Sequence, residues 1–421
     1  MNPKRIFVLF LMLNIVNYLD RNVTSGVLPL LKADFQVNDA MIGLLGTAFM
    51  ITYSIAAIPF GIWSDRWNPY KVAAIGTLIW SLATICSAFA WSFSSLYLFR
   101  ALVGIGEAAF VTTGSTILSN LFPQNKRARI LGLFNLGLPI GSALGVTLGG
   151  AIGGQLGWQW AFLIVGLPGL VLAYFTWKLP QQGVRQAVRT KTTDVTSEET
   201  KELATEVTVG AAVKQTFNKK DIFELFSNAP FMLAALGYAG ISFAFGAIAY
   251  FGTSLFHREF GYSVEFSGTL AGVMIVAAGL LGAPLGGILA DMWMKRSPRG
   301  RIYTVSIAML LSALFLAIGL STLNLFMLYV SIFFMMWHVG IASSIIFDVS
   351  SRHIWNTAQA LALFIMHVLG DVFSTAIIGY ISDRTGLLQA IKLLSIPMLF
   401  AAVMFFAIIF FVPSRKNDQP A

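Results

Sequence analysis

Charged residues are scarce in this chain. Lys, Arg, Asp and Glu make up 11% of the 421 residues, whereas hydrophobic residues make up 57%. Soluble domains carry about 25% charged residues, so this composition excludes an ordinary soluble protein. The only cysteine, Cys86, excludes an intramolecular disulfide and a cysteine-based metal site. The composition therefore indicates an integral membrane protein.

Sequence motifs of enzymes are also missing. The chain has no Gly-Lys-Ser/Thr phosphate loop, no nucleophile elbow and no His-Glu-x-x-His zinc pair. We therefore expect a protein that is not an enzyme and that holds neither a metal nor another cofactor.

Long hydrophobic runs fill most of the sequence. An α-helix needs ~20 apolar residues to cross ~30 Å of hydrocarbon, and about twelve runs meet that length. The first is too long for a signal-peptide core and lacks a small-residue cleavage site, so we expect it to be retained. The predicted fold class is an all-α polytopic membrane protein with about twelve transmembrane helices. They are predicted at 6–29, 40–62, 70–90, 94–117, 128–152, 159–178, 228–252, 266–290, 301–322, 324–347, 357–381 and 388–412.

One long polar segment divides these helices into two sets of six. We predict an N-terminal six-helix bundle at 1–180, a cytoplasmic linker at 181–227 and a C-terminal six-helix bundle at 228–421. Apolar and basic residues at 209–226 recur at roughly helical spacing. They fit either a helix on the membrane surface or a solvated linker that is partly helical.

Basic residues gather on one side of the predicted topology. The net charge is +9, but nearly all Lys and Arg outside the spans lie on the same face as the N-terminus. The opposite face carries only Lys32, Arg258, Arg384 and Lys392. By the positive-inside rule both termini are cytoplasmic. The basic charge therefore reflects topology and does not indicate a nucleic-acid partner. We expect a monomer whose partners are membrane lipids, and we expect its location to be a bacterial inner membrane.

A short motif, Gly-x-x-x-Asp, recurs at the ends of three predicted spans. It occupies 61–66 after the second span and 287–291 after the eighth. A third copy at 379–384 ends the eleventh span on the opposite membrane face. An inverted three-plus-three repeat within the second half would place a copy there. Three copies at symmetry-related ends therefore indicate an internal repeat.

The first copy resembles the signature of the major facilitator superfamily, Gly-x-x-x-Asp-Arg-x-Gly-Arg-Arg. Gly61, Asp65, Arg66 and Lys71 match it, whereas residues 68–70 depart from the usual glycine and basic run. In that family this loop locks the cytoplasmic side while the other side is open. The resemblance implies the same gating role here.

The second copy matches the signature less well. Gly287 and Asp291 are kept, but Met292 stands where the family has Arg. The gating role is therefore better supported for the first half. The resemblance implies two bundles of six helices, the fold of this superfamily.

Further stretches resemble the spinster branch, the proton-linked lysolipid and sphingolipid transporters of this superfamily. The branch-like stretches are 17–21 with 26–29, 100–108, 139–145, and 367–371 with 379–384. They lie in both halves of the chain. The Asn-Tyr-x-Asp-Arg pattern at 17–21 also occurs in organic-anion symporters of the same superfamily.

Ionised side chains lie inside two predicted spans. Asp20 and Arg21 are in the first, and Arg100 and Glu107 share one helical face of the fourth. A charge at the bilayer centre costs ~2.5–3.5 kcal/mol on the gentlest scales, so such residues are expected to be functional. Because the first and fourth spans are partners in the inverted repeat, we expect these four residues to form one cluster that lines a cavity.

We predict that Asp20 and Glu107 bind and release a proton while Arg21 or Arg100 modulates them. The spinster resemblance implies the same two acids as proton-coupling residues. A buried carboxylate and one beside an Arg differ in proton affinity, so alternating access would switch between the two conditions. The other interpretation is a permanently paired structural cluster.

A second pair of polar residues lies in the eleventh span. His367 and Asp371 are one helical turn apart and would form either a proton relay or headgroup contact, or an intrahelical pair that fixes packing. His338 lies among aromatic residues, and we interpret it as structural.

Glycine recurs at every fourth residue of the fifth span, from Gly137 to Gly153, and the eighth span is also rich in glycine. Small residues let membrane helices approach closely. A sharper interpretation is that these two helices slide apart to open a side door to lipid.

Intramembrane cations occur only in the first half, whereas the second-half spans carry mostly aromatic and aliphatic residues. Together with the resemblance, this predicts a proton-coupled secondary active transporter of a lysophospholipid or similar amphiphile. Its headgroup would face the first half and its tail the second. The alternatives are a proton-coupled symporter of a small organic anion and a non-transporting membrane receptor or scaffold.

Overall fold

The computed structural model describes residues 3–122, 130–131, 133–179, 219–351 and 354–412. Within these ranges all regular structure is helical, and twelve helical segments are long and apolar enough to cross a membrane. Six of them precede residue 180 and six follow residue 218. The predicted fold class is confirmed.

Three helices of the first half begin at polar caps. Asn38 and Asn68 accept hydrogen bonds from the first turns of α2 and α3, and Ser92 forms a capping box with Ser95 at the start of α4. Such caps satisfy the backbone N–H groups that a helix start leaves unpaired. The helices are α1 (Pro3–Phe35), α2 (Asp39–Arg66), α3 (Pro69–Ser87), α4 (Phe93–Leu121), α6 (Gly137–Leu156) and α7 (Trp158–Trp177).

The second half contains interrupted spans. Gly340, with φ of +81°, separates a 3₁₀ turn from α15, and a π-helical turn, η4, separates α16 from α17. The elements are α11 (Ala229–Glu259), α12 (Val264–Met294), α13 (Gly300–Thr322), α14 (Leu325–Met335), η2 (Met336–His338), α15 (Ile341–Asp348), α16 (Trp355–Met366), η4 (His367–Asp371), α17 (Val372–Thr385), α18 (Leu387–Lys392), α19 (Ser395–Ala407) and η5 (Ile408–Phe410).

The described part of the predicted linker is helical. Helix α10 (Lys219–Ser227) exposes Phe223 and Phe226 and buries Leu225. Its sequence separates polar from apolar residues around the helix, as is typical of a helix at a membrane surface. Residues 181–218 of the predicted linker lie outside the described residues, and the linker boundaries stay a prediction.

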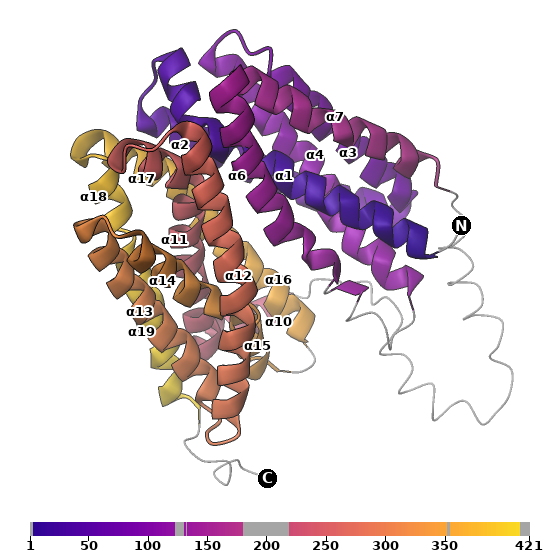
Figure 1. Ribbon diagram of the computed structural model, residues 1–421. Coiled ribbons are helices and arrows are strands. Elements are labelled where there is room, and N and C mark those ends of the chain that lie inside the picture. Colours follow the sequence, from indigo (N-terminus) through magenta and orange to yellow (C-terminus); the bar gives the residue numbers. More distant parts are fainter. Residues whose placement is uncertain (1–2, 123–129, 132, 180–218, 352–353, 413–421) are drawn as a thin grey trace, which may run out of the picture.

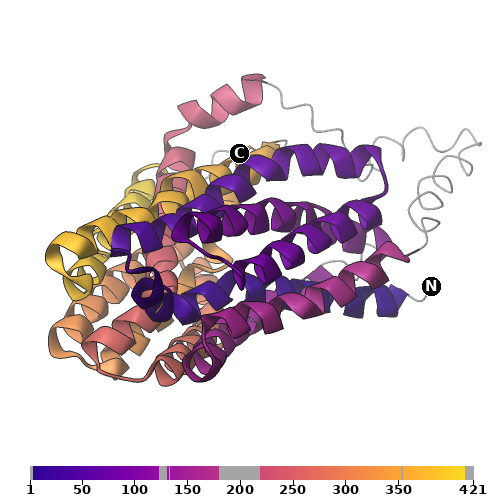
Figure 2. The ribbon, with the colours of Figure 1, turned by 90° about the horizontal axis from the view of Figure 1, so that it is seen from above.

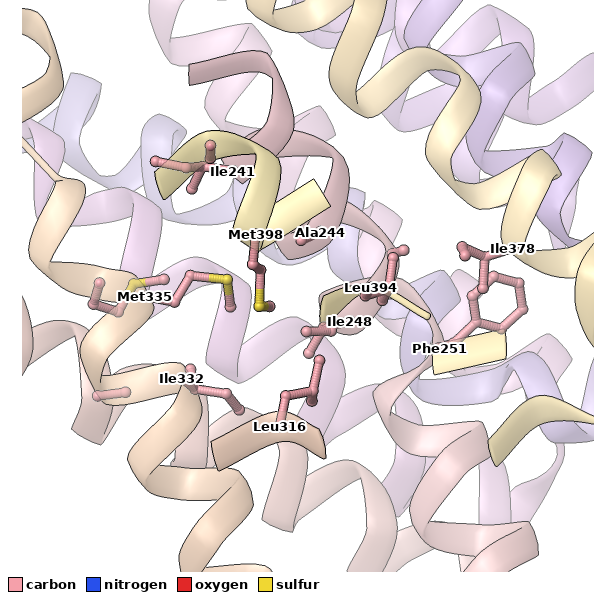
Figure 3. Packing of buried hydrophobic residues seen from close by; sticks show 14 of the residues in the cluster. Ile241, Ala244, Ile248, Phe251, Leu316, Ile332, Met335, Ile378, Leu394 and Met398 are labelled. Carbon is pink, nitrogen blue, oxygen red and sulfur yellow. The ribbon is translucent and has the colours of Figure 1, made fainter. Parts of the chain in front are cut away.

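Helix α11 lies at the centre of the second half. Its residues Ile241, Ala244, Ile248 and Phe251 recur at spacings of three and four, so they share one buried face (Figure 3). Residues from neighbouring helices in the same cluster include Leu316, Ile332, Met335, Leu394 and Met398. In a membrane such contacts stabilise the bundle through van der Waals packing, because lipid is as apolar as the side chains.

Glycine residues bring α6 close to two other helices. A Cβ atom on Gly149 would lie 2.6 Å from the carbonyl oxygen of Val23 on α1. On another face of α6, a Cβ on Gly150 would lie 3.0 Å from the Cα of Gly268 on α12. The predicted close approach is confirmed, and α6 thereby joins the two halves. The side door to lipid stays a prediction.

The halves contact each other near one end of the molecule, through α6 with α12 and α2 with α17. Thr375 on α17 donates a hydrogen bond to the carbonyl of Gly43 on α2 (2.8 Å), and Tyr250 on α11 donates one to the carbonyl of Ile42 (2.9 Å). We call this the closed end; it carries the connections at 36–38 and 260–263. Figures 1 and 2 show the first half (indigo to magenta) beside the second (pink through orange to yellow).

The halves part toward the opposite end, which we call the open end. Here α1 begins and α2 ends. Ile55, Ile58 and Ile62 of α2 are exposed, and a Cβ on Gly61 would meet nothing within 4 Å. Figure 1 shows the ribbons of the two halves diverging in this direction. A protein packed at one end and parted at the other has the shape that alternating access requires.

We expect the Gly149→Val substitution to lower the unfolding temperature, because the added side chain would meet the backbone of α1. Overpacking of this kind costs ~1–3 kcal/mol. The control is Gly287→Val, where a Cβ would meet nothing within 4 Å. Thermal unfolding in detergent measures both variants. An equal loss in the two would show that close helix approach is not the cause.

Candidate functional site

A cavity of about 430 Å³ lies between the two halves. Helices α1, α2, α4 and α6 line it from the first half. Helices α11 and α17 and the irregular segments η2 and η4 line it from the second. Every predicted charged residue of the first-half cluster lies on α1 or α4, two of the helices that line this cavity.

Asp20 and Arg100 form a buried ion pair beside this cavity. Asp20 is fully buried and Arg100 is 2% exposed. The Asp20 Oδ1 atom lies 3.5 Å from Arg100 Nη1. The Thr84 hydroxyl on α3 is closer, 2.6 and 2.7 Å from the two carboxylate oxygens, and donates its proton to them. The carboxylate is thus held by a short hydrogen bond and a longer ion pair.

Arg21 and Glu107 form a second, tighter pair. Arg21 Nη2 and Nε donate to the same oxygen, Glu107 Oε2, at 2.7 and 2.9 Å. Glu107 is fully buried, whereas the Arg21 side chain is 20% exposed and lines the cavity. Within the described residues, Glu107 Oε1 has no hydrogen bond, and neither amide atom of buried Asn17 has one. Arg21 therefore stands between this acid and the cavity.

Aromatic rings surround the Arg21 guanidinium. Its central carbon lies 5.1 Å from the ring centroid of Tyr18 and 4.9 Å from those of Phe49 and Tyr53. Cation–π contact at this range is worth ~0.5–2 kcal/mol and favours a guanidinium over other cations. The rings and Glu107 together hold Arg21 at the cavity wall. The bonds to Glu107 do not use Nη1.

The second half contributes His367 and Asp371 to the opposite wall. Both line the cavity, and His367 Nδ1 lies 2.9 Å from Asp371 Oδ2. Ser242 on α11 donates a hydrogen bond to Asp371 Oδ1. The pair spans the π-helical turn η4, a feature frequent at functional sites. The structure therefore forms the predicted pair, and its role as relay, headgroup contact or packing pair stays a prediction.

His338 is largely buried, and its Nδ1 atom lies 2.6 Å from the carbonyl oxygen of Met335. This contact fits the structural role expected of it. The residue also lines the cavity.

The gate motifs lie at the open end. A Cβ on Gly61 or on Gly287 would meet nothing within 4 Å, and Asp291 is exposed. Lys71 donates a hydrogen bond to the carbonyl of Trp177 (2.5 Å) and lies 3.9 Å from its ring centroid. Lys71 therefore anchors the end of α7.

Two residues of the first motif add little to the gating hypothesis. Arg66 is exposed, and the Asp65 side chain lies outside the described residues. The lock function of both motifs stays a prediction.

Some residues of the site were not predicted from the sequence. Thr84 holds the Asp20 carboxylate, and Ser242 holds Asp371. Both are hydroxyl residues in apolar spans, where many others, such as Thr77, bond only to their own helix. The sequence carries no signal that separates the two kinds. Asn17 was visible as part of the 17–21 motif, and its burial beside the charge cluster became apparent only in three dimensions.

Comparison with known proteins gives consistent results. The model of the Major Facilitator Superfamily matches residues 10–370. The chain is 33% identical to "Protein spinster" of Drosophila melanogaster over 388 residues, which cover 88% of this chain and 60% of that protein. It is 26% identical to "Probable sphingolipid transporter spinster homolog 1" of Arabidopsis thaliana, over 99% of this chain and 91% of that protein. The predicted resemblance to spinster proteins is confirmed.

Solved structures support the fold. A bacterial homolog of the human lysosomal transporter spinster, in an inward-facing and occupied conformation, matches with a TM-score of 0.81 at 19% identity, covering 100% of this chain and 99% of that one. A D-xylose–proton symporter matches with a TM-score of 0.72 at 14% identity, covering 99% of each chain. At these identities the likeness concerns the fold alone.

We expect Arg21→Gln to destabilise the protein more than the double substitution Arg21→Gln/Glu107→Gln. The single change leaves the buried Glu107 carboxylate without its cation, and breaking a fully buried pair costs ~3–5 kcal/mol. Partial exposure of Arg21 should make the loss smaller than this. Thermal unfolding in detergent at neutral pH measures the order. A double variant less stable than Arg21→Gln would contradict the pairing argument.

Proposed function

Because the chain belongs to the major facilitator superfamily, we propose that it is a proton-coupled transporter that moves a lysophospholipid or similar amphiphilic lipid by alternating access. The observation that carries this proposal is the position of Arg21. Its guanidinium faces the cavity between the halves, and a buried acid, Glu107, lies directly behind it. One cation thus contacts both the space for a substrate and a group that can take up a proton.

Proton binding and substrate binding would be coupled through Arg21. A proton on Glu107 neutralises the acid that holds the guanidinium, and Oε1 is the oxygen without a hydrogen bond among the described residues. The guanidinium is then free to bind an anionic headgroup in the cavity. By thermodynamic linkage, substrate binding favours protonation to the same extent. Asp20, with Arg100 and Thr84, is the second proton site in this proposal.

A phosphate-bearing amphiphile fits the two walls of the cavity. Arg presents a planar fork of N–H donors that matches phosphate geometry. On the facing wall, Phe245 and Tyr250 of α11 offer apolar surface for a tail. Met366, the residue just before η4, lines the cavity as well. The names of the spinster relatives, one of them a sphingolipid transporter, also support a lipid substrate.

A symporter of a small organic anion is the second candidate. One observation favours it, because Arg21 and Arg100 both line the cavity. Against it, aromatic and aliphatic side chains form much of the remaining lining. Such walls suit a tail better than a small charged solute. A receptor or scaffold without transport finds no support in the family to which the chain belongs.

We also propose a bacterial inner membrane as the location, with both termini in the cytoplasm. The chain is a multi-pass membrane protein, and its basic residues gather outside the spans on the face of the N-terminus. On this assignment the open end faces the cytoplasm. The conformation described here would then receive its substrate from the cytoplasm or the inner leaflet.

Flux of a labelled lysophospholipid in proteoliposomes, with and without an imposed pH gradient, tests the proposal. We expect gradient-driven flux in the parent and a loss of at least ~10-fold, about 1.4 kcal/mol, in Asp20→Asn and Glu107→Gln. Asp34→Asn is the matched control, because this exposed acid bonds Trp158 at the closed end, away from the cavity. Undiminished driven flux in Asp20→Asn would remove Asp20 from the mechanism.

A competition assay separates the two candidate substrates. We expect unlabelled lysophospholipid to inhibit flux and short-chain dicarboxylates to leave it unchanged, since the latter have no tail for the apolar wall. Arg21→Lys should raise KM more than it lowers kcat, because Lys keeps the charge but loses the fork of donors. If a folded parent moves no lysophospholipid but moves an organic anion, the second candidate replaces the first.

A further inference from the structure

A cluster of charges joins the two halves at the closed end. Asp39, the first residue of α2, is 3% exposed. Arg258 near the end of α11 binds both of its carboxylate oxygens, with Nη2–Oδ1 and Nη1–Oδ2 distances of 2.7 and 2.8 Å. Ser382 on α17 donates to Oδ2 at 2.7 Å. Such a two-pronged bond to Arg is stronger and more specific in geometry than a single contact.

A fourth residue, Asp383, binds the backbone of the other half. Its Oδ1 and Oδ2 accept hydrogen bonds from the N–H groups of Asp39 (2.7 Å) and Ala40 (2.9 Å). These are the first N–H groups of α2, which have no partner within that helix. The next, that of Met41, is capped by Asn38 of the same chain segment. Asp383 therefore caps α2 from across the interface between the halves.

Gly379 makes this contact sterically feasible. A Cβ on Gly379 would lie 2.7 Å from the carbonyl carbon of Asp39 and 3.0 Å from the Cα of Ala40. Any larger residue would hold α17 away from the start of α2. The third copy of the Gly-x-x-x-Asp motif thus uses its glycine for close approach and its aspartate as a cap. The functional proposal above gives this copy no role.

We propose that Asp39, Arg258 and Asp383 form a latch that holds the closed end shut and opens once in each transport cycle. The bonds from Arg258, Ser382 and Asp383 all cross between the halves, so they must break together when this end opens. They lie at the end of the molecule away from the gate motifs of α2 and α12.

The latch is built to open reversibly. Lys32, at the end of α1 in the same half as Asp39, lies 2.7 Å from Asp39 Oδ1. When the halves part, Asp39 therefore keeps one cationic partner. Arg258, already partly exposed, gains water in place of the carboxylate. Leaving either charge buried without a partner would cost several kcal/mol, and this arrangement avoids that cost. A permanent clamp would have no need of this second cation.

Distances between spin labels on the two halves test the latch. We would place labels at Trp91 and Phe326, two exposed positions at the closed end in the first and second halves, in a Cys86→Ser background. The full chain is reconstituted in lipid nanodiscs. We expect one short distance in the parent and a second, longer one in Arg258→Gln and Asp383→Ala. A shift of ~10-fold in the ratio of the two populations corresponds to about 1.4 kcal/mol.

The matched control is Asp34→Ala. This acid also lies at the closed end, but its bond is to Trp158 within the first half, so the distances should stay those of the parent. Arg258→Lys should give an intermediate population, because Lys makes one contact where Arg makes two. In a double-mutant cycle, Asp39→Asn should add little to Arg258→Gln, since both remove the same pair.

Two outcomes would overturn the latch. One is an unchanged distance distribution in both Arg258→Gln and Asp383→Ala, and the other is an equal shift in Asp34→Ala. If Asp383→Ala fails to fold, Asp383→Asn, which keeps one acceptor oxygen, takes its place. The measurement needs no substrate. It can therefore succeed or fail independently of the flux experiments on proton coupling.

Discussion

The absence of water from the hydrocarbon layer is the constraint on which this molecule depends. A charge kept there needs a partner, and each of the four charged residues in the cluster of α1 and α4 has one of opposite sign. The pairs differ in one respect that matters for function. Arg100 lines the cavity but is only 2% exposed, and its partner Asp20 is fully buried. The Arg21 side chain is 20% exposed at the cavity wall, with the buried Glu107 as its partner. In the proposed function, Asp20 and Glu107 would each bind a proton, and Arg21 would also contact the substrate.

Most of the fold could be predicted from hydrophobic runs, because a helix of fixed rise must be long enough to cross a layer of fixed thickness. The charge cluster could be predicted as well. The spacing of Arg100 and Glu107 gives one helical face, and the inverted repeat brings α4 to α1. Which acid pairs with which arginine could not be predicted, because Asp20 and Arg21 are neighbours whose directions depend on how α1 is rotated in the bundle.

The contacts between the two halves could not be predicted from the sequence, for a different reason. Lys32 and Arg258 stand out in the sequence as rare cations on the less basic face, yet the bond of Arg258 to Asp39 joins residues 219 positions apart. In the proposed alternating-access cycle, such contacts would exist in one conformation and be broken in another. The amino-acid sequence specifies all of those states at once, whereas a structure selects one. The repeat at 379–384 could be identified in the sequence, but its contact with the start of α2 could not be predicted.

The π-helical turn η4 has a consequence for the closed end. An α-helix rotates by about 100° per residue, so one additional residue in a turn offsets the phase of everything that follows it. Before η4 in the chain, α16 packs on α11, whereas after it α17 packs mainly on α2 of the other half and also on α11. The phase offset aims Thr375, Gly379 and Asp383 at α2. A ligand in the cavity that straightened this turn would rotate those residues away from α2. It would thereby loosen the closed end without contacting it.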